Sequence, residues 1–402
     1  MGHLADSSPA DFPSGRIAIV GAGIVGSALA YYLSSSPEIN KPIVLIDRSS
    51  SPLNGSTGHA PGFVGQFNES EVLSRLAIDT VREYVKIPGG FDIIGGLEVV
   101  SSEQSIRRLK ERCEMAKALG LSAQLISPHE AVELAPEILK IEDVDAALHF
   151  PGDGAASAGT ITQFYQDEAR KNGVEFIQAD AKAIRTVDGQ IVGIDSKTGI
   201  IDAGVVVLAT GIWTAGLCNL DIPIPIIPVA HPYTYGYPKE RTERKAPWVR
   251  WPEHHVYARN HGPYYGFGSY NHRPIYLEPE DTAIGSWISD FDETLTQAKT
   301  FLANHQSLDF QTKFNGIFAM TPDNLPLVGP IPSVRGLFMA ASVWVTQAAG
   351  AARFLTKVME GQTVDERARK ALDPERFRGQ EWEKLKEISL SGYNDIYKTN
   401  ET

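Results

Sequence analysis

The chain has 402 residues, of which 43% are hydrophobic and 21% charged, which is typical of a globular protein with two packed domains. Its formal net charge of −12 argues against nucleic acid or an anionic membrane as a partner, because either would favour a basic face. Cys113 and Cys218 are the only cysteines, so the sequence has no metal-ligand spacing and no disulfide framework, which favours a reducing compartment.

No segment predicts export or membrane insertion. The apolar runs are shorter than the ~18 residues that a transmembrane helix needs. The first 15 residues contain no Lys or Arg, and the last three, Asn400-Glu401-Thr402, match no targeting signal. We therefore expect a cytoplasmic protein, with the mitochondrial matrix or the peroxisome as alternatives. The oligomeric state is left open.

The first elements in chain order form a βαβ pattern. Residues 16–20 are an apolar run typical of a buried strand, and residues 27–33 continue as a helix rich in Ala, Leu and Tyr. Residues 43–46 form a second strand, which ends on Asp47.

A glycine motif joins the first strand to the helix. In Gly21-x-Gly23-x-x-Gly26, the first glycine makes the tight turn, the second lets the backbone approach a pyrophosphate, and the third lets the helix pack on the strand. The pyrophosphate would sit at the helix N-terminus, and Asp47 would accept hydrogen bonds from a ribose. The pattern predicts a bound dinucleotide. Three glycines that merely form a turn are the alternative.

Further along the chain, predicted strands and helices continue to alternate. Strands are expected at 95–100, 174–177, 205–209 and 337–341, helices at 102–119, 160–172 and 347–359, and a hairpin turn at Asp188-Gly189. The stretch from 221 to about 309 is dense in Pro, Tyr, His and Trp, which is consistent with a separate β-rich domain. Residues from about 365 onward are charged and predict a surface-packed tail.

Two distant segments favour FAD over NAD. The strand that ends in Ala209-Thr210-Gly211 resembles the Ala-Thr-Gly strand of two-dinucleotide-binding-type flavoproteins. Residues 321–329, followed by 336–340, resemble their C-terminal flavin-contacting strand and helix. These resemblances imply a flavoprotein of the α/β class with two domains in an α+β arrangement. A Rossmann-like FAD-binding domain would be assembled from several segments, beside an antiparallel β-sheet substrate domain.

The expected boundaries follow from this discontinuous organisation. They are 15–85, 146–215 and 308–370 for the FAD-binding domain, 86–145 and 216–307 for the substrate domain, and 371–402 for a C-terminal surface tail.

The segment Ser56-Thr57-Gly58-His59-Ala60-Pro61-Gly62 resembles the Ser-Thr-x-His-Ala-Pro-Gly run of dimethylglycine oxidase and the related dimethylglycine and sarcosine dehydrogenases. The resemblance extends over roughly residues 15 to 400. Its other segments are 95–99, 228–231, 266–274, 314–318 and 343–346.

The resemblance implies that His59 bonds covalently to the 8α-methyl carbon of the flavin. An imidazole nitrogen can add to the electrophilic tautomer of that methyl group. The alternative is a turn histidine that caps a nearby backbone group. Monomeric sarcosine oxidase links its flavin through a cysteine instead, but Gly316 occupies that position here, which excludes such a link.

The family's catalytic histidine, which assists removal of a proton near the substrate amine, matches His231, and its tyrosine partner matches Tyr257. A core histidine and a packing tyrosine are the alternatives, because apolar and aromatic residues surround both. Arg259 and Arg273 are candidate clamps for a substrate carboxylate, or members of surface ion pairs. Tyr270 is a further candidate for the substrate site.

The resemblance and the glycine motif together predict a set of cofactor-binding residues and no metal site. The set comprises Gly21, Gly23, Ile24, Val25, Gly26, Asp47, Arg48, Ser56, Thr57, His59, Ala60, Ala209, Gly211, Trp213, Asp323, Trp344, Val345 and Thr346.

The function that the resemblance implies is oxidation of a small secondary or tertiary amine, such as dimethylglycine or sarcosine. A hydride would pass to flavin N5, the imine would hydrolyse, and O₂ or another electron acceptor would reoxidise the flavin. Full-length members continue into folate-binding domains. If this chain is the whole protein, the one-carbon product would leave as formaldehyde, or the substrate is not an N-methyl amine. The alternatives are an oxidase of another secondary or cyclic amino acid or amine, and a non-catalytic regulatory subunit with this fold.

Overall fold

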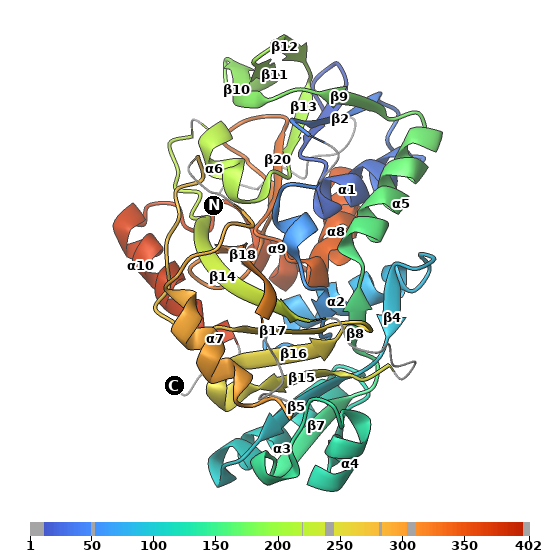
Figure 1. Ribbon diagram of the computed structural model, residues 1–402. Helices are drawn as coiled ribbons and strands as arrows, with labels where there is room; N and C mark the ends of the chain where they lie inside the picture. The colour runs from blue at the N-terminus through green and yellow to red at the C-terminus, as the bar shows by residue number, and fades with distance from the viewer. Residues whose placement is uncertain are drawn as a thin grey trace.

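The computed structural model describes residues 12–49, 53–218, 220–237, 245–280, 284–303 and 310–396. Two large sheets dominate the described part of the chain, one in the upper half and one in the lower half of Figure 1. The expected two-part α/β architecture is confirmed.

The upper sheet has six strands in the order β19-β20-β13-β1-β2-β9. Their bounds are β1 (Ile17–Val20), β2 (Ile43–Asp47), β9 (Glu175–Gln178), β13 (Val205–Leu208), β19 (Leu327–Pro330) and β20 (Leu337–Ala341). All neighbouring strands in this sheet run parallel except β19 and β20. The predicted strands at 16–20, 43–46, 174–177, 205–209 and 337–341 all belong to this sheet.

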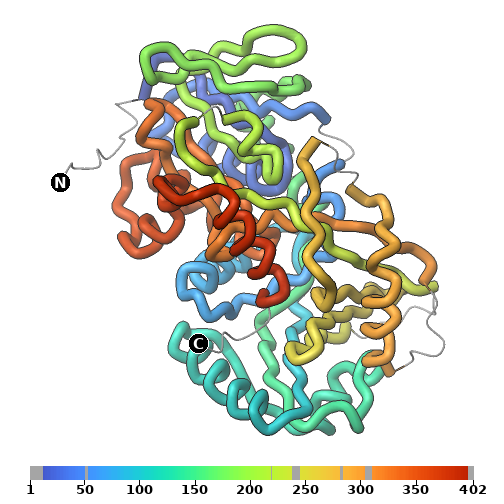
Figure 2. Tube along the Cα trace, turned by 90° about the vertical axis from the view of Figure 1, so that its left-hand side faces the viewer, coloured from blue at the N-terminus to red at the C-terminus, as the bar shows by residue number. Residues whose placement is uncertain are grey.

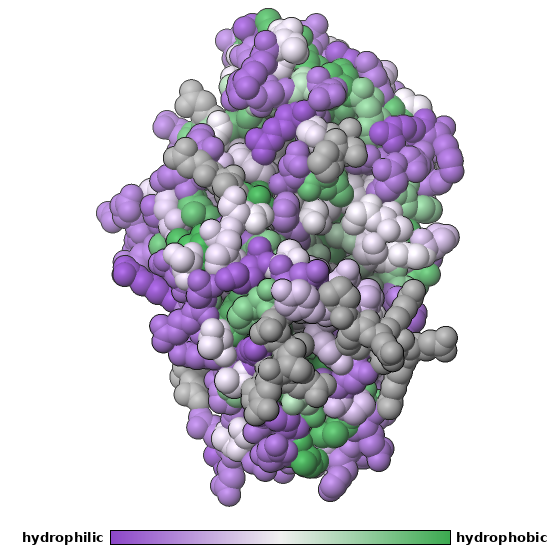
Figure 3. Space-filling model, in the orientation of Figure 1, coloured by the Kyte–Doolittle hydropathy of each residue, from purple (hydrophilic) through white to green (hydrophobic). Residues whose placement is uncertain are grey.

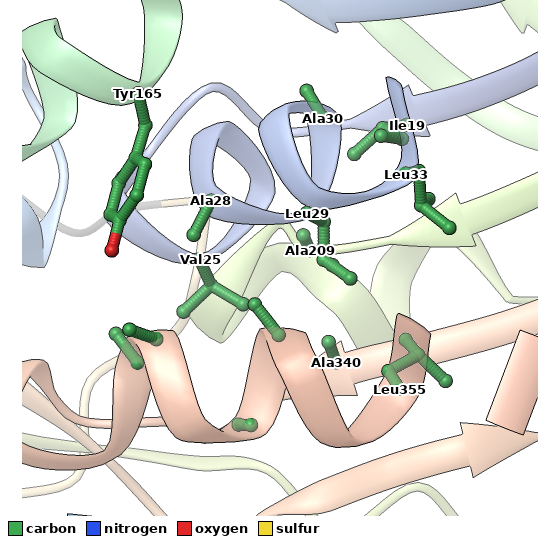
Figure 4. Close-up of a cluster of buried hydrophobic side chains, with 14 of the residues drawn as sticks. Ile19, Val25, Ala28, Leu29, Ala30, Leu33, Tyr165, Ala209, Ala340 and Leu355 are labelled. Carbon is green, nitrogen blue, oxygen red and sulfur yellow. The ribbon is translucent and has the colours of Figure 1, made fainter. Parts of the chain in front are cut away.

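Both faces of the six-stranded sheet are buried, which explains its continuous apolar strands. On one face, Ile17 and Ile19 share a core with helices α1 (Ile24–Ser34), α5 (Ala158–Lys171) and α8 (Ala348–Met359). On the other face, Ala18 and Val20 pack in a second core, which includes residues of a small sheet formed by β10 (Ala181–Val187), β11 (Gln190–Ser196) and β12 (Gly199–Asp202). Figure 4 shows Val25 and Leu29 of α1 pointing toward α8.

The lower sheet has eight strands in the order β18-β14-β17-β16-β15-β5-β7-β6. Their bounds are β5 (Gly96–Val100), β6 (Gln124–Ile126), β7 (Ala146–Phe150), β14 (Ile227–Gly236), β15 (Trp248–Trp251), β16 (Val256–Asn260), β17 (Tyr265–Ser269) and β18 (Phe310–Met320). The pairing is antiparallel except between β15 and β5.

The remaining elements connect or flank the two sheets. They are the short strands β3 (Phe63–Val64), β4 (Phe91–Ile93) and β8 (Gly154–Ala156), and the helices α2 (Glu71–Tyr84), α3 (Glu103–Ala118), α4 (Pro128–Leu134), α6 (Thr214–Leu217), α7 (Phe291–Lys299), α9 (Glu366–Leu372) and α10 (Trp382–Gly392). The 3-10 turns are η2 (Ser56–His59), η3 (Ile141–Asp143), η4 (Gly211–Trp213), η5 (Pro252–His254), η7 (Val345–Gln347) and η8 (Asn394–Ile396). The predicted turn at Asp188-Gly189 joins β10 to β11, and both of its residues have positive φ.

Three segments lie differently from the expected domain boundaries. Strands β7 and β18 belong to the eight-stranded sheet, although their residues were assigned to the FAD-binding domain, because their hydrogen-bond partners are strands of that sheet. The C-terminal segment is also more than a surface tail. Helix α9 packs on β19, whereas α10 packs on β14 and β18, and Tyr393 directly after α10 is fully buried. Figure 2 shows this red segment against the middle of the molecule.

Within the described ranges, no helix is long and apolar enough to cross a membrane. The face in Figure 3 mixes hydrophilic and hydrophobic residues, with hydrophilic ones over most of it.

Candidate active site

A cavity of about 680 Å³ begins at the turn between β1 and α1. Gly21 has φ +104°, and a Cβ atom there would lie 2.4 Å from the carbonyl oxygen of Ala209 on the neighbouring strand. A Cβ at Gly26 would lie 1.8 Å from the carbonyl oxygen of Gly21. Both glycines are therefore required by backbone packing, one for the turn and one for the approach of α1.

The N-terminus of α1 and the end of β2 face the same cavity. The Ile24 N–H donates to the Thr57 hydroxyl at 3.2 Å, and a Cβ at Gly23 would lie 3.1 Å from that hydroxyl oxygen. The Asp47 carboxylate accepts hydrogen bonds from the Ala22 N–H at 2.7 Å and the Ser49 N–H at 2.8 Å. A helix N-terminus beside a carboxylate suits the pyrophosphate and ribose of a dinucleotide.

The segment that carries the predicted covalent link forms the turn η2 at the cavity wall. The Ser56 hydroxyl donates to the Ile317 carbonyl at 3.0 Å, which ties this turn to β18. His59 Nδ1 lies 3.1 Å from the Gly55 carbonyl oxygen. Because a carbonyl only accepts, Nδ1 carries a hydrogen, and in the tautomer that this contact selects, Nε2 keeps its lone pair.

Most of the predicted cofactor residues line this one cavity. They are Gly21, Gly23, Ile24, Val25, Asp47, Arg48, Ser56, Thr57, His59, Ala60, Ala209, Gly211, Trp213, Trp344, Val345 and Thr346. The Arg48 guanidinium lies 4.2 Å from the centre of the Trp213 ring, so a cation–π contact joins these two side chains in the cavity wall beside Asp47.

Gly26 and Asp323 are absent from the cavity lining. Gly26 acts through the packing of α1. The Asp323 carboxylate accepts two hydrogen bonds of 2.8 Å from Arg376 and one from the Leu325 N–H. These contacts order the turn before β19, so Asp323 stabilises a segment outside the cavity.

At its other end, the cavity reaches the eight-stranded sheet. Strand register places Tyr233, Gly268, Tyr257, Arg250 and Glu98 in one row across five neighbouring strands. Residues paired in this way point to the same face of a sheet. A Cβ at Gly268 would lie 2.6 Å from the Tyr257 hydroxyl, so the glycine leaves room for the phenol.

His231 precedes Tyr233 by two positions on β14 and therefore shares its face. Its Nε2 lies 2.7 Å from the Tyr257 hydroxyl, and its Nδ1 lies 2.7 Å from the Tyr393 hydroxyl. The structure thus brings the predicted pair together. Tyr393 was not predicted, because it belongs to none of the sequence motifs. It lies 162 positions after His231, and no local sequence pattern indicates a contact over that separation.

Burial determines the protonation state of His231. The side chain is 2% exposed, and desolvation, together with the nearby His272, holds its pKa well below the usual range. The imidazole is therefore neutral at pH 7. This burial agrees with the apolar surroundings noted in the sequence, and the contact with Tyr257 shows that the buried ring still has a polar partner facing the cavity.

Aromatic side chains enclose His231. The ring centre of Tyr270 lies 4.4 Å and that of Phe318 4.9 Å from the imidazole centre, and Trp344 packs edge-on against Phe318. Tyr270, Phe318 and Trp344 all line the cavity. The predicted substrate residue Tyr270 is thus a wall of the space beside His231.

Arg250 is the arginine that lines the cavity at this end, and sequence reasoning missed it. Its side chain is 14% exposed and pairs with Glu98, which also accepts two hydrogen bonds of 2.8 Å from Arg112. The predicted clamps lie elsewhere. Arg259 lines a separate, smaller cavity, and Arg273 is exposed. The sequence signal that could have identified Arg250 is its position as a charged residue within the otherwise apolar strand 248–251.

The fold and this site define a dinucleotide-binding oxidoreductase. The family model described as DAO: FAD dependent oxidoreductase matches residues 16–358. The chain therefore belongs to this family of FAD-dependent oxidoreductases, and the predicted choice of FAD over NAD is confirmed. The turn, helix amides and Asp47 described above fit that cofactor.

Two curated relatives agree with the resemblance found in the sequence. Mitochondrial sarcosine dehydrogenase of Homo sapiens is 25% identical over 345 residues, which cover 81% of this chain and 37% of that protein. Mitochondrial dimethylglycine dehydrogenase of Rattus norvegicus is 25% identical over 385 residues, which cover 89% of this chain and 44% of that protein. The chain thus spans less than half the length of these relatives.

Among solved structures, L-proline dehydrogenase from P. horikoshii superposes with a TM-score of 0.80 at 22% identity. The match covers 91% of this chain and 98% of that chain. At this identity the likeness establishes the fold.

Proposed function

We propose that this chain oxidises a small secondary or tertiary amine that carries a carboxylate, such as sarcosine or dimethylglycine. The observation that carries the proposal is the continuous cavity from the β1–α1 turn to His231, Tyr257 and Arg250. When bound, FAD supplies the acceptor for a hydride from the carbon next to the nitrogen. O₂ or another acceptor then completes the cycle.

His231 and Tyr257 have the geometry to hold the substrate nitrogen in its neutral form. A hydride leaves only when the nitrogen lone pair is free, so a protonated amine must first lose its proton. The Tyr257 phenol can take that proton while passing its own to His231 Nε2, 2.7 Å away.

A flavin-bleaching screen tests the proposed function. The purified protein is expected to be yellow, to bleach anaerobically with sarcosine, dimethylglycine or a related amino acid, and to recolour on exposure to an acceptor. A flavin-loaded protein that no amine or amino acid bleaches would contradict the proposal and would favour a regulatory role.

Arg250 is proposed to bind the substrate carboxylate. Arg250→Met is expected to raise KM for sarcosine or dimethylglycine roughly 10- to 100-fold, the effect of losing one charge-assisted hydrogen bond. The KM for an amine of similar size without a carboxylate should change little. Steady-state kinetics measures the ratio of the KM for the carboxylate-bearing substrate to the KM for the amine without a carboxylate. Taking this ratio also corrects for any general loss of stability.

Arg273→Met is the matched control, since Arg273 is an exposed arginine of the same domain. Its KM ratio should equal that of the unmodified protein. An Arg250→Met protein with an unchanged ratio would mean that the carboxylate binds elsewhere.

His59 is proposed to bond FAD covalently through Nε2, the nitrogen left with a lone pair by the contact to Gly55. Acid-precipitated protein is expected to stay yellow, and the tryptic peptide that contains His59 should carry the mass of FAD. In His59→Ala the colour should wash out of the acid pellet. The folded variant should still bind FAD, but without a covalent bond. Colour that washes out of the unmodified pellet would show that the flavin is not covalently bound.

A further inference from the structure

A chain of hydrogen bonds runs from the cavity to the C-terminal segment. It joins the Tyr257 hydroxyl to His231 Nε2 at 2.7 Å, His231 Nδ1 to the Tyr393 hydroxyl at 2.7 Å, and that hydroxyl to His272 Nε2 at 2.8 Å. The last contact joins His272 Nδ1 to the Arg273 carbonyl oxygen at 2.9 Å.

The carbonyl at the end of this chain determines the direction of every bond. It only accepts, so His272 Nδ1 carries a hydrogen. Burial lowers the pKa of His272, so the ring is neutral at pH 7 and its Nε2 is an acceptor. The Tyr393 hydroxyl therefore donates its single hydrogen to His272.

The direction of the bond from Tyr393 to His272 also determines the tautomer of His231. Because the Tyr393 hydrogen points to His272, its oxygen accepts from His231 Nδ1–H. His231 Nε2 is consequently the bare nitrogen and accepts from the Tyr257 hydroxyl. This is the tautomer that a base acting through Tyr257 requires. Once Nε2 takes a proton, the bond from Nδ1–H to Tyr393 becomes charge-assisted and stabilises the imidazolium.

We infer that Tyr393 is a positioning residue, which holds His231 in the Nδ1–H tautomer so that Nε2 can take a proton from Tyr257. The inference rests on the proposed function for its effect on rate. Tyr393 lies beyond residues 16–358, the segment matched by the family model, and directly follows α10, which packs on β14 and β18.

The surrounding contacts hold the Tyr393 hydroxyl in place. Tyr393 is 0% exposed, and its ring centre lies 5.2 Å from that of Tyr270. The Asn394 side chain donates to the backbone carbonyls of Tyr270 and His272, the latter at 2.9 Å. These bonds hold the turn after α10 against Tyr270 and against His272, which is itself part of the hydrogen-bond chain.

The inference is tested by NMR of protein labelled with ¹⁵N-histidine, in which protonated and bare ring nitrogens have distinct shifts. The His231 signals are assigned by their loss in His231→Asn. In the unmodified holoprotein, His231 Nδ1 should be protonated and Nε2 bare. In Tyr393→Phe, which keeps the ring and removes the hydroxyl, the population should move toward the Nε2–H tautomer.

His272→Leu provides a second route to the same change. Without an acceptor at His272, the Tyr393 hydroxyl can donate to His231 Nδ1, which again favours the Nε2–H tautomer. The matched control is Tyr276→Phe, because Tyr276 also touches α10, through Lys386, but its hydroxyl donates to Glu278. The His231 signals should be unchanged in this control.

Amine-dependent flavin reduction gives the second readout. Tyr393→Phe should lower kcat roughly 10- to 100-fold with little change in KM, the size seen when the partner that orients a metal-binding histidine is lost. A His231 tautomer that is the same in Tyr393→Phe, His272→Leu and the unmodified protein would overturn the inference. The NMR experiment needs no substrate, so absence of amine oxidation would contradict the proposed function alone.

Discussion

His231→Ala is expected to slow flavin reduction by sarcosine or dimethylglycine on the order of 10²- to 10⁴-fold at neutral pH. The variant removes the acceptor that lies 2.7 Å from the Tyr257 hydroxyl, so the substrate nitrogen keeps its proton and its lone pair stays blocked. Stopped-flow reduction from about pH 6 to about pH 10 measures the effect. Partial recovery at high pH is expected, because solvent then supplies the neutral amine.

The control for this experiment is His254→Ala. The His254 ring stacks on Phe301 at 4.3 Å and is not part of the cavity wall. This variant should reduce at the unmodified rate. If His231→Ala also does so across the pH range, His231 is a packing residue and the proton leaves by another route.

Gly26→Ala is expected to abolish FAD binding and to lower the free energy of unfolding by about 1–3 kcal/mol or more. The added methyl group would lie 1.8 Å from the Gly21 carbonyl oxygen and 3.3 Å from the Ala209 side chain, so α1 must move away from β1. That movement displaces the helix amides from the cavity. Denaturant unfolding and the ratio of flavin to protein absorbance measure both effects.

Gly159→Ala is the matched substitution, since Gly159 is also helical but a Cβ there meets no atom within 4 Å. It should bind FAD normally and be as stable or up to about 1 kcal/mol more stable, because alanine favours a helix over glycine. Equal flavin content in Gly26→Ala and Gly159→Ala would mean that FAD binding does not require a glycine at position 26.

The geometry of the proposed nucleotide-binding end could be predicted because its signals are local. Gly21, Gly23, Gly26 and Asp47 lie within one βαβ unit, where turn geometry and strand–helix periodicity restrict the backbone directly. His231 and Tyr257 were found through family resemblance, and the structure places them 2.7 Å apart. Their pairing follows from the register of three strands, which no short pattern encodes.

The rest of the site was decided by tertiary structure. Glu98 and Arg250 meet because β5 and β15 run side by side, and Tyr393 reaches His231 because α10 packs on β14 and β18. Turns and periodicity are dictated by neighbouring residues, so the sequence by itself determined the turn between β1 and α1 and the alternation of elements. Strand register and helix docking depend on the summed burial of residues far apart in the chain. For that reason, only the folded protein determines which arginine lines the cavity and which tyrosine contacts His231 Nδ1.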